Sequence, residues 1–252
     1  MAGHSKFKNI QHRKGSQDKK RAKIFTKLVR EIMMAVKLGM PDPGHNPRLK
    51  SAIIAARNYN LPKDRIDKAI SQASDPKNDE IYFDMRYEGC LPGGVFVIIE
   101  ALTNNKNRAA SDIKSTLTKF GGHLSEQGSV AFMFDHCGII EYSNITDLDK
   151  FFEDAIELGV KDIESVDDTV IVYTDIENFI STQESLSKTY GDADKSEIGW
   201  NSISHYNVVI EDQERAETLL KLHDVLEDND DVKSIFSNYT ISDNIYQILL
   251  ND

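Results

Sequence analysis

Cysteine is scarce in this 252-residue chain, with only Cys90 and Cys137 present. Two cysteines cannot build a disulfide framework or, alone, a four-ligand zinc site. No apolar run approaches the ~20 residues that span a bilayer, and the charged first 23 residues lack the apolar stretch of a secretory signal. These absences indicate a reducing compartment and no membrane partner, and we expect a cytoplasmic protein.

Recognisable catalytic motifs are also missing. Asp135-His136-Cys137 places a base beside a thiol, but neighbouring residues of a strand point to opposite faces. The glycine-rich residues 88–94 are not followed by the lysine of a phosphate-binding loop, and the seven histidines have no metal-ligand spacing. We therefore predict no enzyme, no metal, no cofactor and no small-molecule substrate.

Positive charge is in deficit overall but concentrated locally. The net charge is −11, yet residues 1–76 hold 17 lysines and arginines against six acidic residues. The remaining residues hold 13 basic and 35 acidic side chains. Because binding to phosphates depends on a local patch, the first segment predicts a nucleic-acid partner despite the acidic total. The alternative is a solvated basic tail.

The densest basic segment ends in a predicted amphipathic helix. Residues 1–16 have no period and indicate an irregular arm, whereas residues 18–38 follow helical spacing. On a helical wheel, a basic ridge lies opposite the apolar stripe of Phe25, Leu28, Ile32 and Val36. The ridge consists of Lys19, Lys23, Lys27, Arg30 and Lys37. One face is expected to pack and the other to be free for phosphates. The predicted nucleic-acid-binding residues are Lys6, Lys8, Arg13, Lys14, Lys19, Lys20, Arg21, Lys23, Lys27 and Arg30.

Two shorter helices follow, the first from about Pro47 until residues 60–62 end it, and the second from there to about Ala73. The composition changes at the polar stretch 74–80. We place a helical domain at 1–76. No helix in it carries asparagine, glutamine and arginine arranged for base edges, so sequence-specific readout is unsupported.

The acidic remainder alternates strands and helices, so the fold class is α+β. Strands are predicted at 81–87, 95–99 and 130–134, with residues 88–94 as the connection between the first two. Residues 136–204 follow the order βαββαβ of a ferredoxin-like unit. Residues 205–252 contribute a strand at 206–210, a helix at 212–227 and a strand at 232–236, too few elements for a domain. We expect them to complete the sheet begun at residue 81, so that 79–135 plus 205–252 form one α/β domain with 136–204 inserted in it.

Two loops are secondary candidates for nucleic-acid contact. Gly93 and Gly94 offer bare backbone to RNA, or simply allow a tight connection between strands. Asn104, Asn107 and Arg108 open a helix predicted at 108–120; they contact phosphate or bases there, or an asparagine caps the helix.

Many ordered motifs resemble the YebC family, which includes the mitochondrial translational activator of cytochrome oxidase. They are residues 1–10, 13–14, 18–25, 46–49, 60–62, 87–89, 92–95, 100–105, 107–108, 121–122 and 128–132. The likeness is strong over about the first 140 residues and extends in outline over the rest. Phe7, Cys90-Leu91 and His123 depart from the usual tryptophan, tyrosine with a small residue, and asparagine, which puts stacking or backbone roles at these positions in doubt.

The resemblance implies an N-terminal helical domain and two α/β domains, one inserted in the other. It also implies a non-enzymatic regulator of gene expression. Two functions stay open: a transcriptional regulator that binds DNA, and a ribosome-associated translation factor that binds ribosomal RNA and eases difficult peptide bonds, such as those at proline runs. A third hypothesis is an adaptor whose acidic α/β domains bind a protein.

Overall fold

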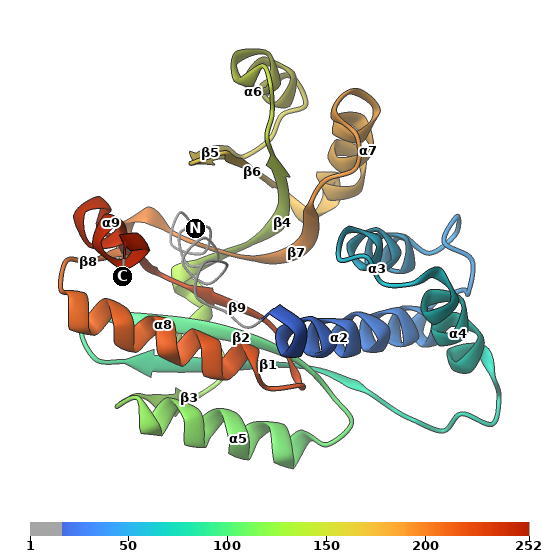
Figure 1. Ribbon diagram of the computed structural model, residues 1–252, viewed down its shortest axis with the longest axis horizontal. Coiled ribbons are helices and arrows are strands. Elements are labelled where there is room, and N and C mark those ends of the chain that lie inside the picture. The colour runs from blue at the N-terminus through green and yellow to red at the C-terminus, as the bar shows by residue number, and fades with distance from the viewer. Residues whose placement is uncertain (1–16, 252) are drawn as a thin grey trace. The chain divides into compact units, whose positions relative to one another are not determined.

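The computed structural model describes the backbone of residues 17–251 and the side chains of residues 21–250. Its helices are α2 Gln17–Leu38, α3 Pro47–Asn58, α4 Lys63–Ser74, α5 Lys106–Lys119, α6 Leu148–Glu157, α7 Phe179–Tyr190, α8 Gln213–Glu227 and α9 Asp243–Asn251 (Figure 1). Its strands are β1 Phe83–Leu91, β2 Val95–Thr103, β3 His123–Ser125, β4 Phe134–Ser143, β5 Asp162–Val166, β6 Thr169–Thr174, β7 Lys195–Ser202, β8 Val208–Ile210, β9 Val232–Ser237 and β10 Tyr239–Ile241. This mixture confirms the predicted α+β class.

The chain divides into two compact units. The first comprises residues 80–135 and 200–252 with the described part of α2 up to Lys27, and the second comprises residues 28–79 and 136–199. None of the described helices is long and apolar enough to cross a membrane. The domain boundaries predicted at residues 76, 79, 135 and 205 stay predictions.

The first unit is built on a four-stranded sheet in the order β3-β1-β2-β9. β1 pairs with β2 antiparallel, from Phe83 opposite Thr103 to Leu91 opposite Val95, and β9 pairs antiparallel with the other edge of β2. Two segments distant in the sequence therefore share one sheet, as expected for 81–134 and 206–252. β8 does not join this sheet, because it pairs in parallel with β10.

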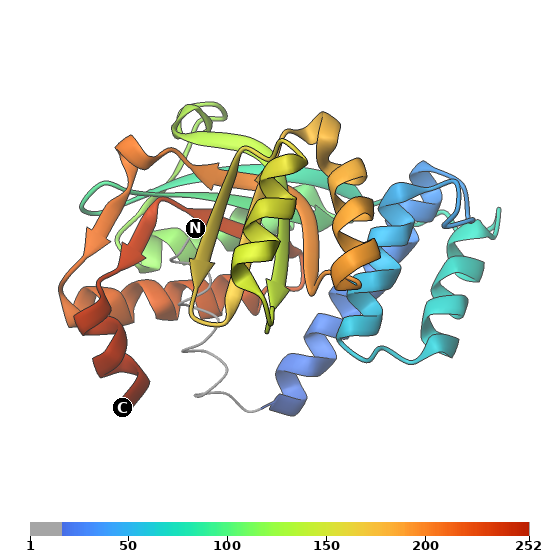
Figure 2. The same cartoon turned by 90° about the horizontal axis from the view of Figure 1, so that it is seen from above.

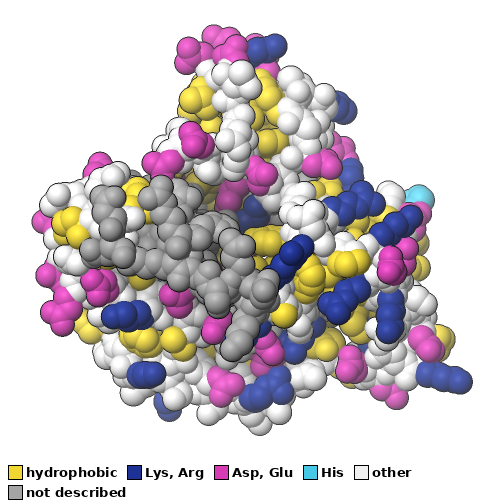
Figure 3. Space-filling model, in the orientation of Figure 1, with side chains coloured by type: hydrophobic (Ala, Val, Ile, Leu, Met, Phe, Trp, Pro, Cys, Tyr) yellow, Lys and Arg dark blue, Asp and Glu magenta, His cyan; other side chains and the backbone are white. Residues whose placement is uncertain are grey.

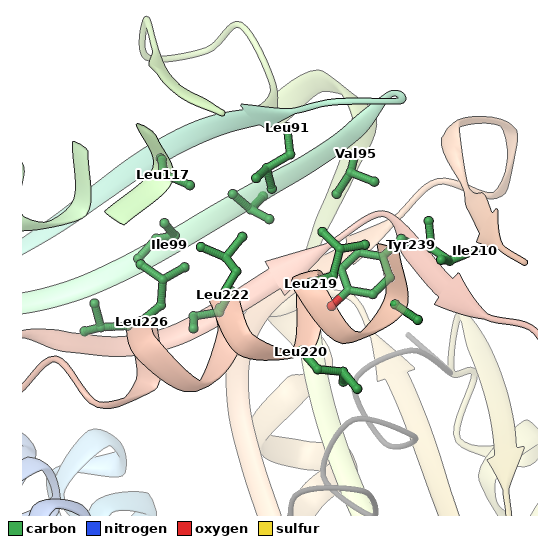
Figure 4. Packing of buried hydrophobic residues seen from close by; sticks show 14 of the residues in the cluster. Leu91, Val95, Ile99, Leu117, Ile210, Leu219, Leu220, Leu222, Leu226 and Tyr239 are labelled. Atoms are coloured by element: carbon green, nitrogen blue, oxygen red, sulfur yellow. The ribbon is translucent and has the colours of Figure 1, made fainter. Parts of the chain in front are cut away.

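Helices α5 and α8 supply the core of this unit. Ala109, Ile113 and Leu117 recur every four residues along α5 and are fully buried. Leucines of α8 pack with them against residues of β1 and β2 (Figure 4). Because burying a leucine or isoleucine side chain contributes about 1.5–3 kcal/mol, this cluster is a main source of the unit's stability.

The second unit contains most of the sheet β5-β6-β4-β7, since the first two residues of β4 and the last three of β7 belong to the first unit. Counted along the chain, β4 is the first strand of this sheet and β6 is the third, and these two lie in the middle of the sheet. This is the arrangement expected for a βαββαβ unit of the ferredoxin type. α6 and α7 pack side by side on one face of this sheet (Figure 2) through Phe151, Phe179 and Leu186, which meet Ile140 and Val172.

The remainder of the second unit contains α3, α4 and the last part of α2. Asn46 joins two of these helices: its side chain caps α3 at Leu49 N, 3.1 Å away, and donates to Ala35 O of α2 at 2.7 Å. Five consecutive residues of α2, Ile32 to Val36, are buried. The expectation of one packed and one free face is therefore wrong for this half of α2.

Several short elements differ from the sequence prediction. Residues 130–134, predicted as a strand, form the 3-10 turn Ala131–Met133 before β4 begins. β1 runs through residues 88–91, which were assigned to the connecting loop. β3 and β10 were missed because three residues are too few to show a period, and α9 was missed altogether.

Candidate nucleic-acid interface

The predicted interface is only partly within the described residues. Lys6, Lys8, Arg13 and Lys14 lie outside them. Lys19 and Lys20 belong to the helix α2, but their side chains are outside the description as well. The geometry therefore bears on Arg21, Lys23, Lys27 and Arg30.

Arg21 is exposed at the start of α2, and its guanidinium carbon lies 5.4 Å from the ring centroid of Phe25. This spacing of four residues places the two side chains on one face of the helix, where a cation–π contact holds the guanidinium. Arg30, further along the helix, is half-buried.

Lys23 and Lys27 are bound to the carboxyl end of α8. Lys23 Nζ donates to Asp228 O at 3.0 Å and lies 3.1 Å from the Asp228 carboxylate. Lys27 Nζ donates to Glu227 O at 2.5 Å. Both ammonium groups therefore have partners within the first unit, so the expectation that this basic face is free is wrong at these two positions. Their role in phosphate binding stays a prediction.

The environment of Lys27 also changes its acidity. Burial lowers the pKa of the Lys27 ammonium to about 8, against the opposing effect of the carboxylates of Glu227, Asp230 and Asp228. The ammonium is mostly charged at pH 7 and loses its proton near pH 8, well below an exposed lysine.

The glycine pair connects β1 to β2 in a left-handed conformation, with φ of +76° at Gly93 and +75° at Gly94. Arg215 Nη2 of α8 donates to Pro92 O at 3.0 Å and to Gly93 O at 3.1 Å. Asn238 Nδ2 donates to Gly94 O at 3.0 Å. The carbonyls of this turn are thus bonded to the protein itself, which favours a structural role; contact with RNA is untested.

Arg108 is likewise engaged within the protein. Its Nε and Nη2 donate to Asp231 Oδ2 at 3.0 and 2.7 Å, and Nη2 also donates to Asn104 Oδ1 at 3.1 Å. Asn105, the residue after Asn104, caps α5 by accepting from Arg108 N at 3.0 Å. Asn107 is exposed. These bonds favour the helix-capping interpretation of this segment.

Arg108→Ala is expected to lower the free energy of unfolding by about 2 kcal/mol. Without the guanidinium, the carboxylate of Asp231, which is only 4% exposed, loses the fork formed by the two nitrogen donors of Arg108. Because the guanidinium is half-exposed, solvent screens the ion pair, and the loss of stability is smaller than for a fully buried pair. Urea denaturation followed by circular dichroism measures it. Arg108→Lys, which keeps the charge without the fork, should lose less. Weaker nucleic-acid binding with unchanged stability would contradict the structural role.

A buried carboxylate that the sequence analysis did not single out organises the loop before β4. Glu88 is 1% exposed and accepts from Gly128 N at 2.8 Å, Val130 N at 2.7 Å and Ala131 N at 3.1 Å. These bonds draw the backbone inward and explain the turn found where a strand was predicted. The sequence analysis assigned Glu88 to the connecting loop, where an acidic side chain is ordinarily exposed, so no local pattern signalled its burial.

The tryptophan of the chain lies in a polar cluster of the same unit. Trp200 Nε1 donates to Glu100 Oε1 at 3.0 Å, and the guanidinium carbon of Arg86 lies 4.9 Å from its ring centroid. Since the chain has a single tryptophan, its fluorescence reports on the folding of this unit.

Partly buried charge also occurs in the second unit. Lys195 forms ion pairs with Glu197 and, at 3.9 Å, with Glu141. Burial alone would lower the pKa of Lys195, but the two carboxylates outweigh it and raise the pKa. Lys195 is therefore held as a cation and unsuited to nucleophilic chemistry. Within the described residues, no cluster of three or more histidine, cysteine or acidic side chains could hold a metal ion.

Comparisons with known proteins agree with the resemblance. A family model described as "TACO1/YebC protein N-terminal domain" matches residues 5–76, and one described as "TACO1/YebC second and third domain" matches residues 82–239. A "Probable transcriptional regulatory protein" of Rickettsia bellii (strain RML369-C) is 55% identical over 250 residues, covering 99% of this chain and 98% of its own.

Two further relatives extend the comparison. "Probable transcriptional regulatory protein A1E_02520" of Rickettsia canadensis is 54% identical over 251 residues, with 99% of each chain covered. The crystal structure of the "Conserved Hypothetical Protein Aq1575 from Aquifex Aeolicus" superimposes with a TM-score of 0.83 at 37% identity, covering 90% of this chain and 93% of that one. With both family models matched and relatives similar over nearly their full length, the chain belongs to the TACO1/YebC family.

Proposed function

We propose that the protein is a non-enzymatic, nucleic-acid-binding regulator of gene expression that binds DNA through its basic N-terminal arm and helix α2. The observation that carries the proposal is the segregation of charge: ten of the first 30 residues are basic and only Asp18 is acidic, in a chain of net charge −11. The names of the relatives support a regulatory role. We place its action in the cytoplasm.

Phosphate contacts supply the affinity in this proposal, because lysine and arginine release condensed counterions when they neutralise phosphates. The arm residues Lys6, Lys8, Arg13 and Lys14 are its first contacts. More basic residues lie exposed on α3 and α4, where lysine and arginine side chains gather on the face drawn in Figure 3. The exposed basic residues of these two helices are Lys50, Arg57, Lys63, Arg65 and Lys68.

The alternative target is ribosomal RNA, in a translation factor that eases peptide-bond formation at proline runs. It is favoured by the lack of a helix with side chains arranged for base edges, since binding through shape and backbone suits folded RNA. DNA is kept as the first target because the curated relatives are named as transcriptional regulators.

A protein-binding adaptor is the second alternative, and the surface of α6 favours it. Leu148 is 42% and Ile156 66% exposed on this helix. The acidic residues Asp149 and Glu157 directly follow these two apolar residues, and Glu153 lies midway between the two acids. All three acidic side chains are exposed. Such a surface suits a partner that is apolar and basic.

Crosslinking to nucleic acid in living cells, followed by sequencing, tests the proposal. The arm variant carries alanine at Lys6, Lys8, Arg13 and Lys14. The control variant carries alanine at four exposed lysines of the acidic part, Lys114, Lys119, Lys150 and Lys188, with the same change in net charge. Discrete DNA sites lost only in the arm variant would support the DNA regulator.

Other outcomes are equally decisive. Ribosomal RNA lost only in the arm variant would favour the translation factor over the DNA regulator. Crosslinks that are the same in the wild type and both variants would contradict binding through the arm. Full regulatory function in the arm variant would support the adaptor.

A further inference from the structure

The carboxyl end of α8 presents a concentration of negative charge to α2. Glu227 is the last residue of the helix and Asp228 its C-cap, and Asp230 follows in the loop. The last carbonyls of a helix lack intrahelical partners and carry the negative end of the helix dipole. Carbonyl oxygens and carboxylates at this helix end therefore offer lysine the same kind of partner that a phosphate group offers.

Lys23 and Lys27 occupy this position, one helical turn apart on α2. Lys23 contacts both the carbonyl and the carboxylate of Asp228, and Lys27 contacts the carbonyl of Glu227. Spacing of four residues brings both ammonium groups to one side of the helix. These are two of the lysines assigned to phosphate binding, so their contacts with α8 occupy donors that would otherwise be available to phosphate groups.

We propose that the acidic end of α8 is an internal phosphate mimic that holds Lys23 and Lys27 and competes with nucleic acid for them. This inference rests on the proposed function. Nucleic acid that binds the arm raises the local phosphate concentration beside α2 and displaces the carboxyl end of α8 from the two lysines. The arm then makes the first contact, and release of α8 adds two more.

The ion pair of Lys23 with Asp228 is weak enough to be displaced. The side chain of Lys23 is 39% exposed and that of Asp228 58% exposed, and an ion pair exposed to this degree changes an equilibrium constant by about fivefold at most. A polyanion that exchanges condensed counterions for lysine can exceed that gain. The contact with α8 therefore weakens nucleic-acid binding rather than preventing it.

The test compares affinities for two probes, a fluorescein-labelled duplex DNA of mixed sequence and a labelled single-stranded RNA of equal length. Fluorescence anisotropy gives Kd between about 50 and 200 mM salt. The α8 variant carries Glu227→Gln, Asp228→Asn and Asp230→Asn. We expect its affinity for duplex DNA to rise about twofold to fivefold, with a log–log salt slope steeper by up to about one, because the ion pair of Lys23 is removed while Lys27 keeps the backbone carbonyl of Glu227.

A matched control separates this contact from a general gain of positive charge. The α6 variant carries Asp149→Asn, Glu153→Gln and Glu157→Gln, which change the net charge by the same amount at exposed positions. Adding Lys23→Ala and Lys27→Ala to the α8 variant should cancel its gain. An equal gain in the α6 variant, or a gain that survives the two alanines, would overturn the proposal.

The arm variant distinguishes failure of the phosphate mimic from failure of the proposed function. Binding by the wild type that the arm variant loses, with no effect of the α8 variant, would overturn the phosphate mimic and leave the proposed function standing. No binding by the wild type or any variant would overturn both. Fluorescence of Trp200 checks that each variant is folded. Should the triple variant not fold, Asp228→Asn alone should raise affinity about twofold, and no change would overturn the proposal.

Discussion

Replacing Lys6, Lys8, Arg13 and Lys14 with alanine is expected to make the log–log salt slope of duplex DNA binding shallower by about three to four. Each phosphate contact contributes about 0.9 to the slope of a wild type expected at about −5 to −7. Affinity near 0.1 M salt should fall by about a hundredfold or more, because four sets of condensed counterions are no longer released. Anisotropy titrations at several salt concentrations measure both quantities.

The control variant at Lys114, Lys119, Lys150 and Lys188 should change this slope by less than one, since these lysines lie outside the basic segment. Lys23→Ala with Lys27→Ala should also cost less than the arm variant, because both lysines are held by α8 before binding. A wild-type slope shallower than about −2 would count against the interface, since it leaves room for only two contacts.

Glu88→Ala is expected to lower the free energy of unfolding by about 3–5 kcal/mol. The carboxylate accepts from three backbone amides of the loop before β4. Each amide that loses its partner away from water costs about 1–3 kcal/mol, and Arg86, whose Nε lies 3.4 Å from Glu88 Oε1, loses its counterion as well. Urea unfolding followed by Trp200 fluorescence measures the change.

Glu88→Gln is the control for this substitution. The side-chain amide of glutamine has nearly the same shape as the carboxylate and keeps one acceptor oxygen. Its NH2 group is a donor, however, and faces a backbone N–H that the second carboxylate oxygen accepted from. A loss of about 1–3 kcal/mol is expected. Equal stabilities of the wild type and both variants would show that the bonds of Glu88 contribute little to the fold.

The sequence alone was sufficient wherever the physical cause is local. The spacing of Phe25, Leu28, Ile32 and Val36 located α2 to within one residue of its observed start, because a helix repeats every 3.6 residues along its own chain. Alternating elements predicted the ferredoxin-like unit, and the ordered motifs identified the family. The excess of positive charge before residue 77 is likewise a property of the sequence alone.

The tertiary structure decided which groups meet across long separations. Lys23 is 205 residues from Asp228, and Glu88 is 42 residues from Val130. No period or local propensity encodes such partners, because they depend on how α8 and the loop before β4 fold back on the chain. The sequence was therefore enough for the fold class, for most of the longer helices and strands, and for the sign of the charge in each part. That two lysines of α2 are held by the carboxyl end of α8 follows only from the three-dimensional fold, because such pairing depends on distance in space.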